Sequence, residues 1–116
     1  MRIVSPAESR RLNRAYRGQD KPTNVLSFPA SAHERALTGS IGDIVICAAV
    51  VAAEARGQGK PLTAHWAHMV VHGTLHLLGH DHLERGDARR MEGLEVEILR
   101  RFGYHDPYLT RPTPLA

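Results

Sequence analysis

The sequence is poor in cysteine and in long apolar runs, and each shortage excludes a class of protein. The lone Cys47 cannot form an internal disulfide, and its position within IVICAAVV predicts a buried, inert thiol. The lack of a disulfide scaffold suits a reducing compartment. No apolar run approaches the roughly 18 residues that a membrane-spanning helix needs, and no secretory signal is visible in the N-terminal stretch MRIVSPAESRR. We therefore expect a cytoplasmic protein with no membrane partner.

The net charge of the chain is also small, whereas histidine is abundant. The net charge of +3 and the pI near 9.5 permit an anionic partner such as RNA but do not require one. Eight of the 116 residues are histidines, a composition that raises the question of a metal. A chain of this length forms one domain. We expect that domain to span residues 1–108 and to be followed by a flexible tail at residues 109–116.

Local patterns predict an α+β fold, a small mixed β-sheet with helices packed on it. The sequence Ser5-Pro6 with Glu8 is typical of a helix start, and Gly18 of a helix end. The run 42–47 is continuously apolar, so we expect it to be the central strand. Residues 30–40 are expected to form a polar loop. The predicted strands cover residues 2–4, 24–28 and 42–47, and the predicted helices about residues 6–17, 48–57, 64–78 (capped by Thr63) and 84–102.

The last predicted helix shows an apolar stripe and a charged face. Apolar side chains recur at helical spacing and predict its buried side, at Met91, Leu94, Ile98 and Phe102. Arginines alternate with acidic residues and predict an exposed side, which includes Glu92, Glu95 and Glu97.

Four histidines and an aspartate fall within the stretch HGTLHLLGHDH, residues 72–82. His72 and His76 lie on one helical face, where two imidazoles can point at one ion. Gly79 lets the chain leave the helix, so His82 is free to supply a third ligand. Three protein ligands leave a coordination position open, as in catalytic zinc sites. A metal site is therefore predicted at the C-terminal end of a central helix.

His68 is four residues before His72 and offers a competing pair. Histidines that continue along one straight helix cannot all converge, because each step of four residues rises about 6 Å. Only the pair 72 and 76 is followed by a glycine and a further histidine at short range. His68 is then expected in packing or as an outer partner that orients a ligand. His65 is expected on the surface.

Asp81 lies between two histidines, His80 and His82. It can orient a ligand histidine, the usual role of a carboxylate beside a metal-bound imidazole, or cap the helix that follows. His80 is expected to face solvent or the edge of a pocket.

The histidine spacing also looks like that of zinc proteases. Those enzymes carry a glutamate directly after the first histidine to activate water, and Gly73 occupies that position here. Its missing side chain is expected to leave room for a bulky phosphodiester beside the metal. Neutral imidazoles suit one zinc ion, although other divalent transition metals are possible.

The segment AHMVVHGTLHLLGHDH resembles the signature of the YbeY family of bacterial metal-dependent endoribonucleases. Three further stretches are similar to other blocks of that family, LNRAYRGQDKPTNVLSFP (12–29), GDIVIC (42–47) and MEGLEVEILRRFGYHDPY (91–108). The resemblance covers about residues 2–108. It implies a single-domain α+β protein with a zinc ion held by three histidines, here His72, His76 and His82.

The resemblance also implies a substrate and partners. Family members act as single-strand-type endoribonucleases in ribosomal RNA processing, especially 16S rRNA 3′ end maturation, and in ribosome quality control. The expected partners are ribosomal RNA and the small ribosomal subunit or its proteins. An arginine that matters in the family corresponds to Arg17, which we expect to clamp a phosphate. Lys21, Arg56 and Lys60 are candidate RNA-binding residues.

One departure concerns the N-terminus, because family members usually carry several tens of residues before the position of Arg2. A missing edge strand would leave unpaired backbone groups. We therefore expect the shorter N-terminus to affect the stability of the protein and its affinity for RNA.

Two alternative functions remain. The first is a zinc metallopeptidase-like hydrolase, against which Gly73 argues. The second is a non-catalytic ribosome-associated zinc protein. Three histidines with no evident fourth protein ligand argue against that.

Overall fold

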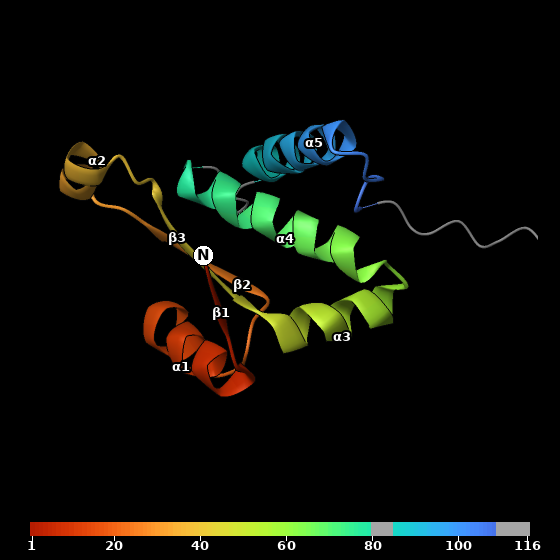
Figure 1. Ribbon diagram of the computed structural model, residues 1–116, viewed down its shortest axis with the longest axis horizontal. Helices are drawn as coiled ribbons and strands as arrows, with labels where there is room; N and C mark the ends of the chain where they lie inside the picture. The colour runs from red at the N-terminus through yellow and green to blue at the C-terminus, as the bar shows by residue number, and fades with distance from the viewer. Residues whose placement is uncertain (80–84, 109–116) are drawn as a thin grey trace, which may run out of the picture.

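The computed structural model describes residues 1–79 and 85–108 and shows a three-stranded mixed sheet with five helices (Figure 1). The strands β1 (Arg2–Val4), β2 (Val25–Pro29) and β3 (Gly42–Cys47) lie in the order β1-β3-β2. β1 pairs with β3 in parallel, and β2 pairs with β3 in the antiparallel direction. The predicted α+β class and the central position of the third strand are confirmed.

Helix α1 (Pro6–Arg17) begins and ends at the predicted residues. The Ser5 hydroxyl accepts a hydrogen bond from the Glu8 backbone N–H at 3.2 Å, and Gly18 takes a left-handed φ of 68°. The loop after α1 folds back along the helix, because the Asn13 amide donates to the Lys21 carbonyl at 2.8 Å. Ser9 Oγ bonds to both backbone groups of Thr23.

The prediction of a polar loop at residues 30–40 is wrong. Helix α2 (Ala32–Thr38) occupies most of this segment, and the Ser31 hydroxyl caps it by accepting from the Glu34 N–H at 3.1 Å. All of its residues are exposed, so α2 carries no apolar stripe that would indicate a helix.

The remaining helices lie close to their predicted positions. They are α3 (Ala48–Gln58), α4 (Leu62–Leu77) and α5 (Arg85–Arg101). The prediction that Thr63 caps α4 is wrong, because the helix begins two residues earlier than predicted, at Leu62 after Pro61, and has no side-chain cap. None of the helices in the described part of the chain is long and apolar enough to cross a membrane.

The sheet separates α1 from α4. Alternating strand residues point to opposite faces, and one face, with Val25, Ile44 and Ile46, packs against Met69 and Leu77 of α4. On the other face, the Phe28 ring contacts the Tyr16 ring of α1, with centroids 4.8 Å apart. Figure 1 shows α1 on one side of the strands and α4, covered in turn by α5, on the other. Cys47 is buried in the sheet, as predicted.

The C-terminal ends of α1 and α4 reach the same end of the sheet. Tyr16, in the last turn of α1, packs on Phe28. Phe28 pairs with Asp43, the residue after Gly42, and a Cβ at Gly42 would lie 2.8 Å from the Leu77 side chain at the end of α4. The φ of 138° and the close approach of the Phe28 carbonyl to that Cβ restrict this position to glycine.

Helix α5 buries a different stripe from the one predicted. Its fully buried residues are Met91, Glu95 and Leu99, whereas Phe102 is 74% exposed. Leu94 and Ile98 are half-buried beside this stripe. The stripe is therefore rotated towards the side that carries Glu95.

Residues 104–108 return from α5 to the start of α4. The Tyr104 N–H donates to the Leu99 carbonyl at 2.9 Å, and the Lys60 ammonium donates to the Pro107 carbonyl at 2.6 Å. The predicted tail, residues 109–116, lies outside the described residues.

Candidate metal centre

A row of histidines runs along α4 on the side that faces α3 and α5. The opposite side of the helix packs on the sheet through small or apolar residues, including Gly73, so the imidazoles are directed away from the strands. The spacing of three or four residues keeps successive rings on one side. The row consists of His65, His68, His72 and His76.

His72 and His76 have the geometry of two ligands of one ion. Their Nε2 atoms face each other at 3.2 Å, and their ring centroids lie 4.7 Å apart. Two nitrogens at about 2.0–2.1 Å from a tetrahedral zinc ion lie roughly 3.3 Å apart. These two residues therefore fit a shared metal with little movement.

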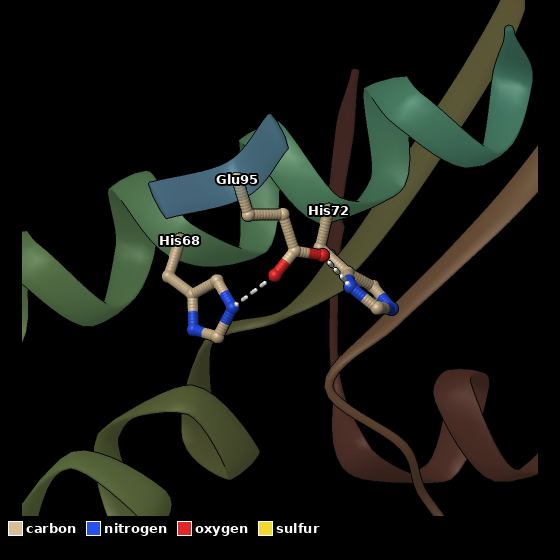
Figure 2. Close-up of side chains that lie close together, drawn as sticks. All are labelled: His68, His72 and Glu95. Carbon is tan, nitrogen blue, oxygen red and sulfur yellow. Dashed lines mark hydrogen bonds and ion pairs between the residues drawn. The ribbon is translucent and has the colours of Figure 1, made fainter. Parts of the chain in front are cut away.

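Glu95 orients the His72 ring by bonding to Nδ1, the nitrogen that does not face His76. Its Oε1 lies 2.5 Å from His72 Nδ1, and its Oε2 lies 2.9 Å from His68 Nε2 (Figure 2). A proton on Nδ1 donated to the carboxylate leaves Nε2 as the basic nitrogen that faces His76. This is the carboxylate–histidine arrangement that fixes the ring and the tautomer of a metal ligand.

Glu95 is completely buried and ionised. Burial raises the pKa of its carboxyl, but hydrogen bonds from His68, His72 and Tyr108 outweigh burial and lower the pKa to about 2. The Tyr108 hydroxyl donates to Oε2 in a short hydrogen bond. Burial and this bond both raise the pKa of Tyr108, so its hydroxyl keeps the proton that it donates.

A second set of ligand atoms shares His72. His68 Nε2, His72 Nδ1 and a Glu95 oxygen lie within 4.8 Å of one another and could hold a metal ion. The Glu95 carboxylate already stands between the two nitrogens and bonds to both. An ion at this position would replace those hydrogen bonds, whereas an ion between His72 and His76 leaves them in place.

The structure describes only part of the predicted ligand set. It brings His72 and His76 together and places His68 against Glu95, with the His68 ring edge-on to the His72 ring at a centroid distance of 6.2 Å. The predicted third ligand His82, the predicted orienting residue Asp81, and His80 lie outside the described residues.

The prediction that His65 lies on the surface is wrong. His65 is 2% exposed, and its Nε2 lies 3.0 Å from Glu54 Oε1 on α3. The Asn24 amide donates to the same carboxylate at 3.0 Å. His65 therefore belongs to a polar network that ties α4 to α3 and to the start of β2.

The expected role of Gly73 in making room at the metal is also wrong. A Cβ at Gly73 would lie 3.0 Å from the side chains of both Ile44 and Val25. The Gly73 carbonyl accepts a hydrogen bond from Ser27 Oγ at 2.8 Å. The missing side chain lets α4 approach the sheet closely, on the side away from the imidazoles.

The predicted phosphate-binding residues lie in two places. Arg17 ends α1, at the end of the sheet where α4 also ends, and Lys21 lies in the loop that folds back to Asn13; both are exposed. Arg56 is exposed in the last turn of α3. Lys60 is half-buried with its ammonium bonded to the Pro107 carbonyl, and burial lowers its pKa.

Sequence reasoning missed Glu95 and Tyr108. The prediction that Glu95 lies on an exposed helix face is wrong: the residue is fully buried, and three hydrogen-bond donors compensate its burial. Its spacing of four residues from both Met91 and Leu99 was the available signal. Tyr108 had no comparable signal, since it follows a glycine and a proline outside any helix.

Two comparisons with known proteins show the family of the chain and a similar fold. The family model described as Endoribonuclease YbeY matches residues 1–103. The solution structure of TM1509 from Thermotoga maritima is similar with a TM-score of 0.53 and 28% identity, over 92% of this chain and 75% of that chain. The matched family segment contains the whole histidine row and the buried glutamate. This chain belongs to the YbeY family of endoribonucleases.

Proposed function

We propose that this protein is a metal-dependent endoribonuclease that cleaves single-stranded ribosomal RNA. The observation that carries the proposal is the pair of Nε2 atoms of His72 and His76, 3.2 Å apart, with a buried carboxylate behind His72. The third ligand in this proposal is His82, and the ion is zinc.

The residues around the ion have separable tasks. His72 and His76 bind it, and Glu95 keeps His72 in one tautomer and one orientation. His68 and Tyr108 hold the other oxygen of Glu95. When bound, a zinc ion supplies a Lewis acid and lowers the pKa of coordinated water towards neutrality.

Arg17 is the proposed contact to the phosphodiester. A guanidinium can donate two parallel hydrogen bonds to phosphoryl oxygens, and so stabilise the negative charge that builds on them during cleavage. The position of Arg17 at the same end of the sheet as His76 supports this role. Its side chain has to reach round the edge strand β2, because the sheet lies between the two helices.

The proposed biological role follows from the family. We place the reaction in the cytoplasm, in 16S rRNA 3′ end maturation and in ribosome quality control, with the small ribosomal subunit or its proteins as partners. The proposal needs an RNA-binding surface, and the basic α1 segment is compatible with one.

The test presents zinc-loaded protein with structured ribosomal RNA and, separately, with casein. We expect RNA cleavage that disappears with a chelator and in His72→Ala. The matched control is His33→Ala, since His33 is an exposed histidine on α2 outside the row, and it should cleave normally.

Each alternative function has its own outcome in this test. Casein cleavage by the unmodified protein that disappears in His72→Ala would favour the metallopeptidase interpretation. Zinc binding with no cleavage of either substrate would favour a non-catalytic zinc protein. RNA cleavage that survives both His72→Ala and the chelator would indicate a contaminating nuclease and would remove the support for the proposal.

A further inference from the structure

The excess positive charge of the protein is concentrated at its N-terminal end. Residues 1–21 contain six arginines and lysines against two acidic residues, a net charge of +4 without histidine. The remaining residues contain nine basic and ten acidic side chains, a net charge of −1. The overall charge of +3 therefore arises entirely from α1 and the segments that flank it.

Three of these arginines form a stripe along α1. Arg10, Arg14 and Arg17 are spaced by four and three residues, so they lie on one side of the helix. At 1.5 Å per residue, the stripe extends about 10 Å along the axis. All three are exposed, and the stripe ends at Arg17, the proposed phosphate contact.

The stripe borders a hollow in which arginines are paired with carboxylates. The hollow has a volume of about 500 Å³ and is lined by Arg10, Arg11, Arg14, Ala15 and Asp20. Asp20 accepts two hydrogen bonds from the Arg10 guanidinium, at 2.8 and 3.1 Å. Glu8 holds Arg11 in the same two-bonded way. Asp20 therefore occupies donors of Arg10 that a phosphate would take, so this carboxylate competes with the ligand for Arg10.

We propose that this arginine stripe, Arg10, Arg14 and Arg17, binds successive phosphates of single-stranded RNA and leads the strand to the metal centre. Arginine suits this task because its planar guanidinium donates bidentately to phosphate. The partner is RNA rather than an acidic protein, an inference that rests on the proposed function. The direction of the track follows from the fold, since α1 and α4 end at the same end of the sheet.

Binding of a fluorescein-labelled single-stranded RNA oligonucleotide tests the proposal, measured by anisotropy between about 50 and 200 mM salt. A chelator is present, and the RNA is checked for integrity afterwards. The test variant is Arg10→Ala with Arg14→Ala. The matched control is Arg100→Ala with Arg101→Ala, which removes the same charge from exposed positions at the end of α5.

Losing two phosphate contacts should reduce the slope of log K against log salt by about 1.4, since each contact on a single strand contributes about 0.7. The same numbers predict an affinity loss of about 25-fold at 0.1 M salt. The α5 control should change affinity by less than about twofold, as expected when net charge alone changes far from the contacts. Asp20→Asn should tighten binding, because it removes the negative charge within the stripe.

Equal losses in the α1 variant and the α5 control would overturn the proposal, because net charge and not the stripe would then govern binding. Unchanged binding by the α1 variant would overturn it as well and leave the endoribonuclease proposal standing. Failure of the unmodified protein to bind RNA at the lowest salt would count against both proposals.

Discussion

Replacing Glu95 by glutamine tests how the metal centre is built. Glu95 is fully buried and receives hydrogen bonds from His72, His68 and Tyr108. Glutamine keeps the shape of the side chain but is neutral, and it has one carbonyl oxygen where the carboxylate has two acceptors. The amide can keep its carbonyl towards His72 only by presenting its NH₂ group to the other donors.

The size of the effect depends on the position of Glu95 relative to the ion. Losing the outer partner of a metal-bound histidine typically reduces metal affinity by about 10- to 100-fold, which is roughly 1.4 to 2.8 kcal/mol. The loss of a hydrogen bond to a charged group, about 1.5–3 kcal/mol, gives the same range. We expect a loss of this size in Glu95→Gln and a far greater loss in His76→Ala, which removes a ligand.

Zinc affinity is measured by competition with a chromophoric chelator, on variants whose folding has been verified by circular dichroism. The matched control is Glu97→Gln, two residues along α5, where the carboxylate is exposed and paired with Arg101. It should bind zinc as the unmodified protein does. The reasoning is refuted if Glu95→Gln abolishes zinc binding while His76→Ala retains it, because Glu95 would then be a direct ligand together with His68 and His72.

Three further substitutions have defined outcomes. Tyr108→Phe removes one donor to Glu95 and should reduce zinc affinity by less than Glu95→Gln does, about three- to tenfold. Chelator competition measures this loss, with Tyr104→Phe as the control. Full zinc affinity in Tyr108→Phe would show that Tyr108 only covers the site. Gly73→Ala should destabilise the protein by about 1–3 kcal/mol through overpacking against Ile44 and Val25; urea unfolding measures this, and unchanged stability with lost zinc binding would restore a role for Gly73 at the metal. Gly42→Ala places a Cβ against the Phe28 carbonyl at a φ of 138°, so it should destabilise the protein more than Gly73→Ala does in the same urea experiment. Equal or smaller destabilisation would contradict the strain argument.

Most of the fold could be predicted because its signals are local. Ser5, Pro6, Glu8 and Gly18 define α1 through backbone caps that need no tertiary partner. The apolar run of β3 indicates its central place in the sheet. Helix α2 has the same kind of cap at Ser31, but it buries no residue and therefore lacks the apolar periodicity by which helices are recognised.

The candidate site could be predicted only in part, because its supporting groups come from distant segments. The four-residue spacing of His72 and His76 lies within one helix and is visible in the sequence. Burial of Glu95 depends on donors 23 and 27 residues away, at His72 and His68. The burial of His65 likewise depends on Glu54, which a helical pattern in α4 cannot reveal.

The position of the metal is the most direct test of the account. Anomalous diffraction at the zinc edge from crystals of the zinc-loaded protein would locate it. If His72 and His76 share the ion, a single peak lies about 2.0–2.1 Å from Nε2 of both residues, with Glu95 still bonded to His72 Nδ1. A peak bonded to His72 Nδ1 and to an oxygen of Glu95, with His76 not coordinated, would contradict it.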